Sequence, residues 1–370
     1  MTDGLIKALS FILFIVIGIL LKRKFTSKDE VNGLKKIILL LALPATIFIA
    51  LLKIQINLGL FLLPFLALGF NILLYFITPG LLLLLGIQDK PTVNTARLLI
   101  PSLAPGLSCF PFILEFLGPD YLAKAAMADL GNKFFVLIVL YLVALRWYLN
   151  NQSIPKESTK NKLVSLIKTL LFEPINAFII VALILLTFGF NNTNLPIVLQ
   201  EILNRLSVIM APLVLIFIGL SVRIQKTEFL QIFSLLSLRA ALTIFIIGSL
   251  SYFFKVGVEN DILLYLVFGL SACSFWPFAH ICGVSDKEIE VPEARKTFNM
   301  EFALAILTFS LPFSVLLILG ILTAGDTFAH YSHQLKLASI LFLLGIAIPL
   351  YNYIKKGAQI KERYKAQEDT

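Results

Sequence analysis

Long apolar stretches, separated by short polar connections, follow one another along almost the whole chain. A helix needs about 20 largely apolar residues to cross the hydrocarbon core of a bilayer, so each such stretch predicts one membrane-spanning helix. The pattern predicts eleven spans, at residues 4–22, 34–53, 58–86, 97–117, 120–147, 169–190, 195–222, 231–254, 261–283, 297–322 and 335–355. We therefore expect an all-α polytopic membrane protein.

The composition agrees with this interpretation and excludes several classes of function. Of the 370 residues, 58% are hydrophobic and 14% are charged, whereas soluble domains average roughly 45–50% apolar and about 25% charged residues. The three cysteines have neither metal-site nor disulfide spacing. Nothing resembles a catalytic constellation, so we expect no enzyme, no cofactor and no metal. The basic residues fall in connections, which indicates membrane topology and no nucleic-acid partner.

The positive charges alternate from one connection to the next. Of the 31 Lys and Arg residues, 24 fall on one set of connections, counting Arg97 and Arg239, and 6 fall on the other. The positive-inside rule assigns the richer set to the cytoplasm. This predicts the N-terminus outside and the C-terminus in the cytoplasm, as an odd number of spans requires. We expect a multi-pass protein of the plasma membrane, which is the inner membrane in a bacterium.

An internal repeat runs through the first ten spans. Three landmarks recur at nearly equal spacings in both halves, namely Pro44, Pro111 and Asn132, then Pro212, Pro277 and Asn299. Because each half has five spans, the second half enters the membrane from the opposite side. This predicts an inverted repeat of five plus five helices, an architecture of secondary transporters. The expected domains are 1–148 and 169–322, with a cytoplasmic linker 149–168, an additional C-terminal helix 335–355 and a cytoplasmic tail 356–370.

Two short stretches, 107–112 and 273–278, match each other when they are aligned on Pro111 and Pro277. A proline inside an apolar segment removes a backbone donor and clashes with the preceding turn, so we expect spans four and nine to break there. Each proline suits the start of a half-helix, whose N-terminus carries partial positive charge. We expect both outer half-helices on the same side of the membrane, with a site for a small organic anion between the helix ends.

Side chains near the two breaks are the candidate substrate-binding residues. Besides the two prolines, they are Ser108, Cys109, Asn132, Ser274, Trp276 and Asn299. The serines either donate to the substrate or satisfy their own interrupted backbone. The asparagines either line the site or join helices, and the repeat favours site lining. Trp276 either stacks on an aromatic substrate or fills the space beside a broken helix.

Four ionisable side chains within the spans are candidates for proton coupling: Asp129, Lys133, Glu301 and His280. Asp129 and Lys133 are four residues apart on one helical face and could form an ion pair, with Glu301 as the alternative partner of Lys133. A carboxylate whose partner changes between two states of a transporter would take up and release a proton. The alternative is a static ion pair. His280 either shuttles protons or packs as a neutral hydrogen-bonded group.

Several segments resemble the auxin efflux carrier family of permeases, which is related in architecture to the bile acid/sodium symporters. The likeness lies in LALPATIF, FPFILEFLGPDYLAKAA and TFSLP, at residues 41–48, 110–126 and 308–312, and in the motif at 173–175. The resemblance implies that spans four and nine cross near the midplane, that spans one, two, six and seven form a scaffold, and that spans three to five and eight to ten form a mobile core. It also implies a carboxylate substrate and asparagines that help to line the pocket. The eleventh span, Glu173 in place of the usual asparagine, and a missing asparagine near the first crossing depart from the family pattern.

Together these features predict a secondary active transporter of a small organic anion, working by alternating access of the core against the scaffold. We expect transport to be coupled to protons. Sodium coupling of the bile-acid type is the first alternative, although the glutamate that those relatives carry at the second crossing is absent from residues 271–278. A non-transporting membrane sensor is the second. The remaining predicted partners are the lipid bilayer and a second copy of the chain, in a homodimer through the scaffold helices.

Overall fold

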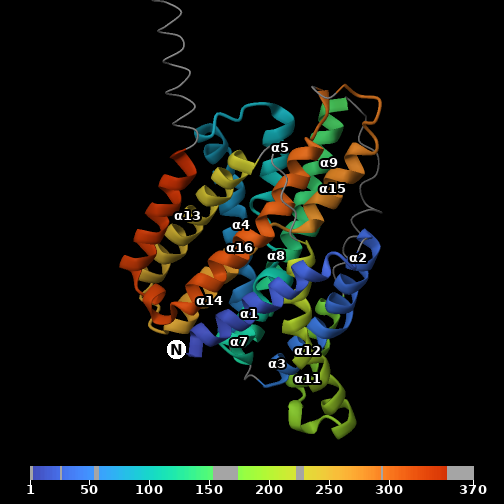
Figure 1. The fold of residues 1–370 in the computed structure, drawn as a ribbon, viewed down its shortest axis with the longest axis vertical. Helices are drawn as coiled ribbons and strands as arrows, with labels where there is room; N and C mark the ends of the chain where they lie inside the picture. The colour runs from blue at the N-terminus through green and yellow to red at the C-terminus, as the bar shows by residue number, and fades with distance from the viewer. Residues whose placement is uncertain are drawn as a thin grey trace, which may run out of the picture.

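The structure is a computed structural model, and it describes residues 3–25, 27–53, 58–152, 174–221, 229–292 and 295–347. Helices joined by short connections account for these residues, and no strand occurs among them. In this part of the chain, seven helices are long and apolar enough to cross a membrane, and two shorter apolar helices add to them. The protein is therefore an all-α polytopic membrane protein, as the sequence predicts (Figure 1).

The first half of the chain folds into helices close to the predicted spans. They are α1 Asp3–Leu21, α2 Lys28–Ile37, η1 Ile38–Ala42, α3 Leu43–Lys53, α4 Leu58–Leu84, α5 Lys90–Leu99, α6 Pro105–Ser108, α7 Phe110–Phe116, α8 Pro119–Phe134, η2 Phe135–Val139 and α9 Leu140–Gln152. Ser27 caps α2 by accepting a hydrogen bond from the N–H of Glu30, and Asp89 caps α5 in the same way through Thr92. Pro44 is the second residue of α3, just beyond the π-helical turn η1, whose wider hydrogen-bond spacing accommodates the missing donor of the proline.

The second half also follows the predicted spans. Its elements are α11 Pro174–Thr187, η3 Asn192–Asn194, α12 Ile197–Ser221, α13 Phe229–Phe253, α14 Glu259–Gly269, α15 Phe275–Ser285, α16 Met300–Thr323, η5 Gly325–Ala329 and a C-terminal helix, Tyr331–Ala347. Glu173, most of the predicted linker 149–168, the last part of the predicted helix 335–355 and the tail 356–370 lie outside the described residues.

Spans four and nine are both interrupted, but the first interruption does not lie where the sequence predicts it. The helical hydrogen bonding stops at residues 100–104, between α5 and α6, and is disturbed again only briefly at Cys109. In span nine it stops at residues 270–274, directly before α15. Pro111 is the second residue of α7 and Pro277 the third residue of α15. Both prolines occupy the first turn of a helix, where no intrahelical donor is needed, and therefore follow a break without causing it.

The half-helices α7 and α15 lie at opposite ends of the molecule, so the expectation that they share one side is wrong (Figure 1). Near the end of α7, Glu115 lies 3.7 Å from the ammonium of Lys7 in the first turns of α1. By contrast, α15 packs against α9 and α5, and Lys287 just after it lies over the ring of Tyr148 near the end of α9. The reason is geometric: span nine runs through the protein in the opposite direction to span four.

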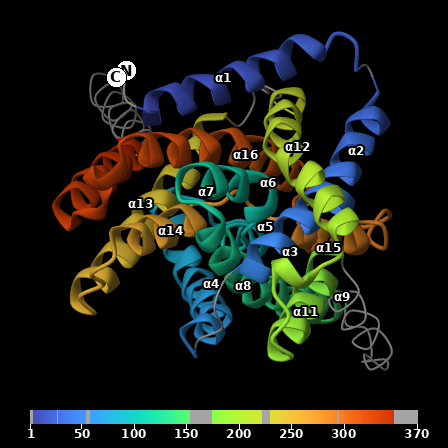
Figure 2. The ribbon, with the colours of Figure 1, turned by 90° about the horizontal axis from the view of Figure 1, so that it is seen from below.

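The helices form two groups that pack mainly within themselves. One, here called the flanking group, contains α1, the α2–α3 span, α11 and α12. In it α1 and α12 cross at two glycines, where a Cβ on Gly18 would lie only 2.3 Å from the carbonyl oxygen of Ile216. The other, here called the crossing group, contains α4, α5–α7, α8–α9, α13, α14–α15 and α16. Figure 2 shows α1, α2 and α12 along one side of the molecule and α13 and α14 on the other.

The C-terminal helix packs along α13 and therefore belongs with the crossing group (Figure 1). A Cβ on Gly345 would meet the side chain of Leu238 at 2.6 Å, so the two helices approach closely there. At the other end of the contact the rings of Tyr252 and Tyr331 stack at 4.9 Å.

Candidate functional site

The two interrupted stretches, residues 100–104 and 270–274, lie against each other inside the crossing group. The N–H of Ala104 donates a 2.8 Å hydrogen bond to the carbonyl oxygen of Ala272. Nearly all residues of both stretches are buried. Non-helical backbone at membrane depth requires such partners, because the bilayer offers none. Spans four and nine therefore meet at their interruptions, and we call residues 100–104 and 270–274 the crossing.

Serine hydroxyls satisfy several backbone groups of the crossing. The hydroxyl of Ser108 accepts from the N–H of Ala272 at 3.0 Å and donates to the carbonyl of Ala104 at 2.9 Å. The hydroxyl of Ser102 accepts from the N–H of Ser274 at 2.9 Å. Ser274 in turn caps α15 by accepting from the N–H of Trp276. Both predicted serines thus engage interrupted backbone in this structure, which is the second of the two roles considered for them.

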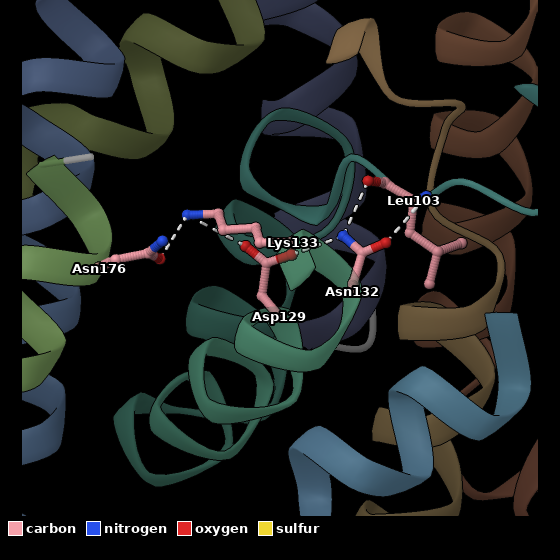
Figure 3. A network of polar contacts seen from close by, with 5 residues as sticks. All are labelled: Leu103, Asp129, Asn132, Lys133 and Asn176. Carbon is pink, nitrogen blue, oxygen red and sulfur yellow. Dashed lines mark hydrogen bonds and ion pairs between the residues drawn. The ribbon is translucent and has the colours of Figure 1, made fainter. Parts of the chain in front are cut away.

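Asn132 holds the first interrupted stretch (Figure 3). Its side-chain oxygen accepts from the N–H of Leu103 at 3.2 Å, and its amide donates to the carbonyl of the same residue at 2.9 Å. Asn71 of α4 donates to it at 3.0 Å, and it donates to Asp129 at 2.8 Å. With 1% of its surface exposed, Asn132 replaces the helical partners that Leu103 has lost.

Asp129 and Lys133 form a buried ion pair one turn from this contact, with 3.5 Å between carboxylate and ammonium. Lys133 also donates a 3.0 Å hydrogen bond to the side-chain oxygen of Asn176 on α11. Figure 3 shows the resulting chain of contacts from Asn176 through Lys133, Asp129 and Asn132 to Leu103. Because α11 belongs to the flanking group, this series of side-chain contacts connects the crossing to the boundary between the two groups.

Asn299 does not occupy the place that mirrors Asn132. It caps α16 by accepting from the N–H of Phe302, and its amide donates to the hydroxyl of Thr92 in the first turn of α5. The residue that contacts the second interrupted stretch is Ser310, buried in α16, whose hydroxyl accepts from the N–H of Cys273 at 3.2 Å. The repeat in the sequence did not single out Ser310, because Ser310 lies farther along the chain from Pro277 than Asn132 lies from Pro111.

Glu301 and His280 lie apart from the chain in Figure 3. Glu301 is exposed in the first turn of α16, where a negative charge suits the helix dipole. Two partners were predicted for Lys133, Asp129 and Glu301, and the structure pairs it with Asp129. His280 lies 2.9 Å from the carbonyl oxygen of Val136 in the π-helical turn η2, and its ring meets that of Tyr141 edge-on. A π-helical turn frees carbonyl groups, and His280 satisfies one of them.

The remaining predicted site residues surround the crossing. Cys109 is fully buried at the joint between α6 and α7, and Pro111 is buried in the next turn. Trp276 is half-buried and Pro277 buried in the first turn of α15. The three cysteines are free thiols, and Cys109 and Cys273 are buried. Within the described residues no three His, Cys, Asp or Glu side chains gather in a way that would hold a metal ion.

Arg239 is the residue that the sequence interpretation missed. The charge count assigned it to a cytoplasmic connection, but it lies in the middle of α13 with 3% of its surface exposed. Its guanidinium donates to the carbonyls of Ile100 at 2.9 Å, Ser102 at 3.4 Å and Ser271 at 2.8 Å, so it binds both interrupted stretches. An arginine inside an apolar span is itself a signal of function. Removing it from the count leaves 23 basic residues against 6, and the predicted orientation is unchanged.

Comparisons with known proteins assign no family to this chain, because no family model and no curated protein matches it.

Proposed function

We propose that this protein is a secondary transporter of a small organic anion, with the substrate site at the crossing. The observation that supports it most is the contact between two interrupted helices, made by the backbone hydrogen bond from Ala104 to Ala272. Secondary transporters build their sites from discontinuous helices that meet near the midplane. A purely structural membrane protein has no need to interrupt two helices at one place, since each interruption removes intrahelical hydrogen bonds.

The anionic character of the substrate follows from the polarity of this place. The N-terminus of α15, an eleven-residue helix, opens on the crossing at Ser274. A helix N-terminus carries a partial positive charge and favours a carboxylate. Half-buried Trp276 and half-exposed Phe275 lie in the same turn and offer apolar surface to the uncharged part of the substrate.

The two helix groups supply the parts that alternating access needs, with the flanking group as scaffold and the crossing group as mobile core. On the α7 side they pack through Phe11, whose ring contacts those of Phe112 and Phe116 at 5.3 and 5.9 Å. Toward the opposite end, Lys35 of α2 lies over the ring of Phe275. An inverted repeat of five plus five helices, as in the auxin efflux carriers that the sequence resembles, would account for both interruptions and for the reversed direction of span nine.

Asp129 is the group that we propose for proton coupling. Its partner Lys133 also binds Asn176 across the boundary between the two groups. A movement of the core against the scaffold would break the bond to Asn176 and change the surroundings of the ion pair. Glu301 lacks such a position because it is exposed at the start of α16, and His280 binds backbone within the crossing group.

The experiment is an uptake measurement with the full chain in lipid vesicles. Purified protein is first screened for thermal stabilisation by monocarboxylates and dicarboxylates at two pH values, with and without sodium. Uptake of a stabilising compound is then measured for wild type, Trp276→Ala and Trp147→Ala, the second being the matched control because Trp147 packs on Phe298 away from the crossing. We expect uptake to fall in Trp276→Ala only. If no carboxylate stabilises the protein and vesicles take up none, the proposal is wrong.

Proton coupling is tested in the same vesicles. Uptake driven by an inward or outward pH gradient is compared between wild type, Asp129→Asn and the control Glu301→Gln. We expect the gradient to drive uptake in wild type and the control, and to lose its effect in Asp129→Asn. An unchanged gradient response in Asp129→Asn would remove Asp129 from the coupling mechanism.

A further inference from the structure

Arg239 is a buried cation whose charge the proposed anion site does not use. Each of its three hydrogen bonds ends on a main-chain carbonyl of the crossing. Among the described residues it forms no ion pair, in contrast to Lys133, which pairs with Asp129. A buried charge without a counter-ion is costly unless something else balances it. The question is therefore which negative charge balances Arg239.

Two helix C-termini supply that charge. Helix α5 ends at Leu99 and its capping residue Ile100 binds Arg239 through the carbonyl. Helix α14 ends at Gly269, and the carbonyl of Ser271 beyond its cap binds the same guanidinium. Each helix C-terminus carries about −0.5 of an elementary charge, so the two ends together carry about −1, which one guanidinium neutralises. The planar fork of arginine can donate to several oxygens at once, which a lysine ammonium does with less defined geometry.

In carriers with interrupted helices, unwound carbonyls and helix C-terminal ends are the groups that bind a coupling sodium ion. Here the corresponding carbonyls already bind a cation that belongs to the chain. We propose that Arg239 is a fixed internal cation that assembles the crossing in place of a bound sodium ion. The crossing then forms without sodium, and, on the basis of the function proposed above, the transport cycle requires none.

The C-terminal helix packs against the part of α13 that carries Arg239. Its neighbour Leu238 packs against Gly345 of the C-terminal helix, and a Cβ on Gly345 would also come within 3.1 Å of the carbonyl oxygen of Ser234 on α13. The eleventh helix thus lies against the part of α13 that carries Arg239. This contact gives the additional helix a role in the crossing group, namely to hold α13 in place.

Cysteine labelling tests the proposal without a known substrate. Cys273 belongs to the crossing and Cys109 lies beside it, at the joint between α6 and α7. Both thiols are buried, so they report its opening, and Cys282 is replaced in a Cys282→Ser background. Maleimide incorporation into the purified full chain is followed by mass spectrometry for Arg239→Ala and for Arg97→Ala. Arg97 is the matched control because it is also a helical arginine of the crossing group but lies over the rings of Tyr75 and Trp147.

We expect Arg239→Ala to label at least about tenfold faster than the background protein, since it loses charged hydrogen bonds that hold the crossing closed. Low-millimolar guanidinium chloride should slow the labelling of Arg239→Ala, because the free ion replaces the missing group, and should leave Arg97→Ala unchanged. Labelling and melting temperature of the background protein should be the same in sodium chloride and in choline chloride of equal ionic strength.

Three results would overturn the proposal: sodium-dependent labelling of the background protein, equal labelling of Arg239→Ala and Arg97→Ala, or no response of Arg239→Ala to guanidinium. If Arg239→Ala does not yield folded protein, Arg239→Lys replaces it, and its labelling is expected to be faster than that of the background protein. Labelling at the background rate would then overturn the guanidinium-specific role. Neither readout needs transport. A failure to find uptake would therefore remove the transporter proposal and leave the fixed cation standing, and the reverse also holds.

Discussion

The two interrupted stretches of the crossing occupy equivalent positions in the fold, but different types of side chain bind their backbone groups. Leu103 of the first has both its N–H and its carbonyl bound by one amide, that of Asn132. Cys273 of the second has its N–H bound by a single hydroxyl, that of Ser310. Leu103 and Cys273 are each the fourth residue of their stretch. Asn132 and Ser310 therefore bind matching backbone positions, although one is an amide and the other a hydroxyl.

This difference indicates that the first stretch is the more firmly held. Asn132 is itself fixed by Asn71 and Asp129, so several partners resist its movement. The second stretch depends more on side chains of span four, namely the hydroxyls of Ser102 and Ser108, while Arg239 donates to both stretches. We therefore expect the second stretch and α15 behind it to open first when the crossing is disturbed.

Removal of the Asn132 amide should have the largest effect. In Asn132→Leu the N–H and the carbonyl of Leu103 lose their partner and Asn71 loses its acceptor, which should lower the free energy of unfolding by about 4 kcal/mol. Denaturant unfolding of the purified protein measures this, with exposed Thr187→Val on α11 as control. A loss no greater than that of Ser310→Ala would show that the two stretches are held equally.

Lys133→Met should follow, because it leaves the carboxylate of Asp129 buried without its partner, at a cost of about 3 kcal/mol. The double variant Asp129→Asn/Lys133→Met should recover most of this loss, since no charge is then left unpaired. A double-mutant cycle on unfolding free energies gives the coupling between the two residues. Purely additive losses would mean that the pair contributes nothing to the stability of the crossing.

Ser310→Ala should cost about 1.5 kcal/mol, the price of one unpartnered buried N–H at Cys273. More tellingly, maleimide should reach Cys273 faster while Cys109 keeps its rate, because only the second stretch has lost its support. Labelling of each site is resolved by peptide mass spectrometry. Equal acceleration at both cysteines would show that the crossing opens as a unit and would contradict the proposed difference.

Asn299→Ala should have the smallest effect, about 1 kcal/mol, as expected for the loss of a helix N-cap. It should leave the labelling of both crossing cysteines unchanged, because Asn299 contacts α5 near its start and not the crossing. The same unfolding and labelling experiments measure it. Faster labelling of Cys273 in this variant would restore Asn299 as the counterpart of Asn132.

The sequence by itself determined where the helices lie. Each of the eleven predicted spans overlaps a helix among the described residues, and spans four and nine are interrupted there, because the length of an apolar stretch is a local property of the chain. The ion pair between Asp129 and Lys133 was equally predictable, since a separation of four residues brings two side chains together on any helix.

Only the tertiary structure decided which side chains serve the crossing. Membrane helices are apolar nearly all round, so their sequences do not reveal which face meets a neighbour. Arg239 was assigned to a connection although it binds both interrupted stretches, and Ser310, not Asn299, supports the second. The first interruption likewise lies at 100–104 and not at Pro111. These contacts depend on the distances at which helices far apart in the chain approach each other, and a pattern along one chain does not contain those distances.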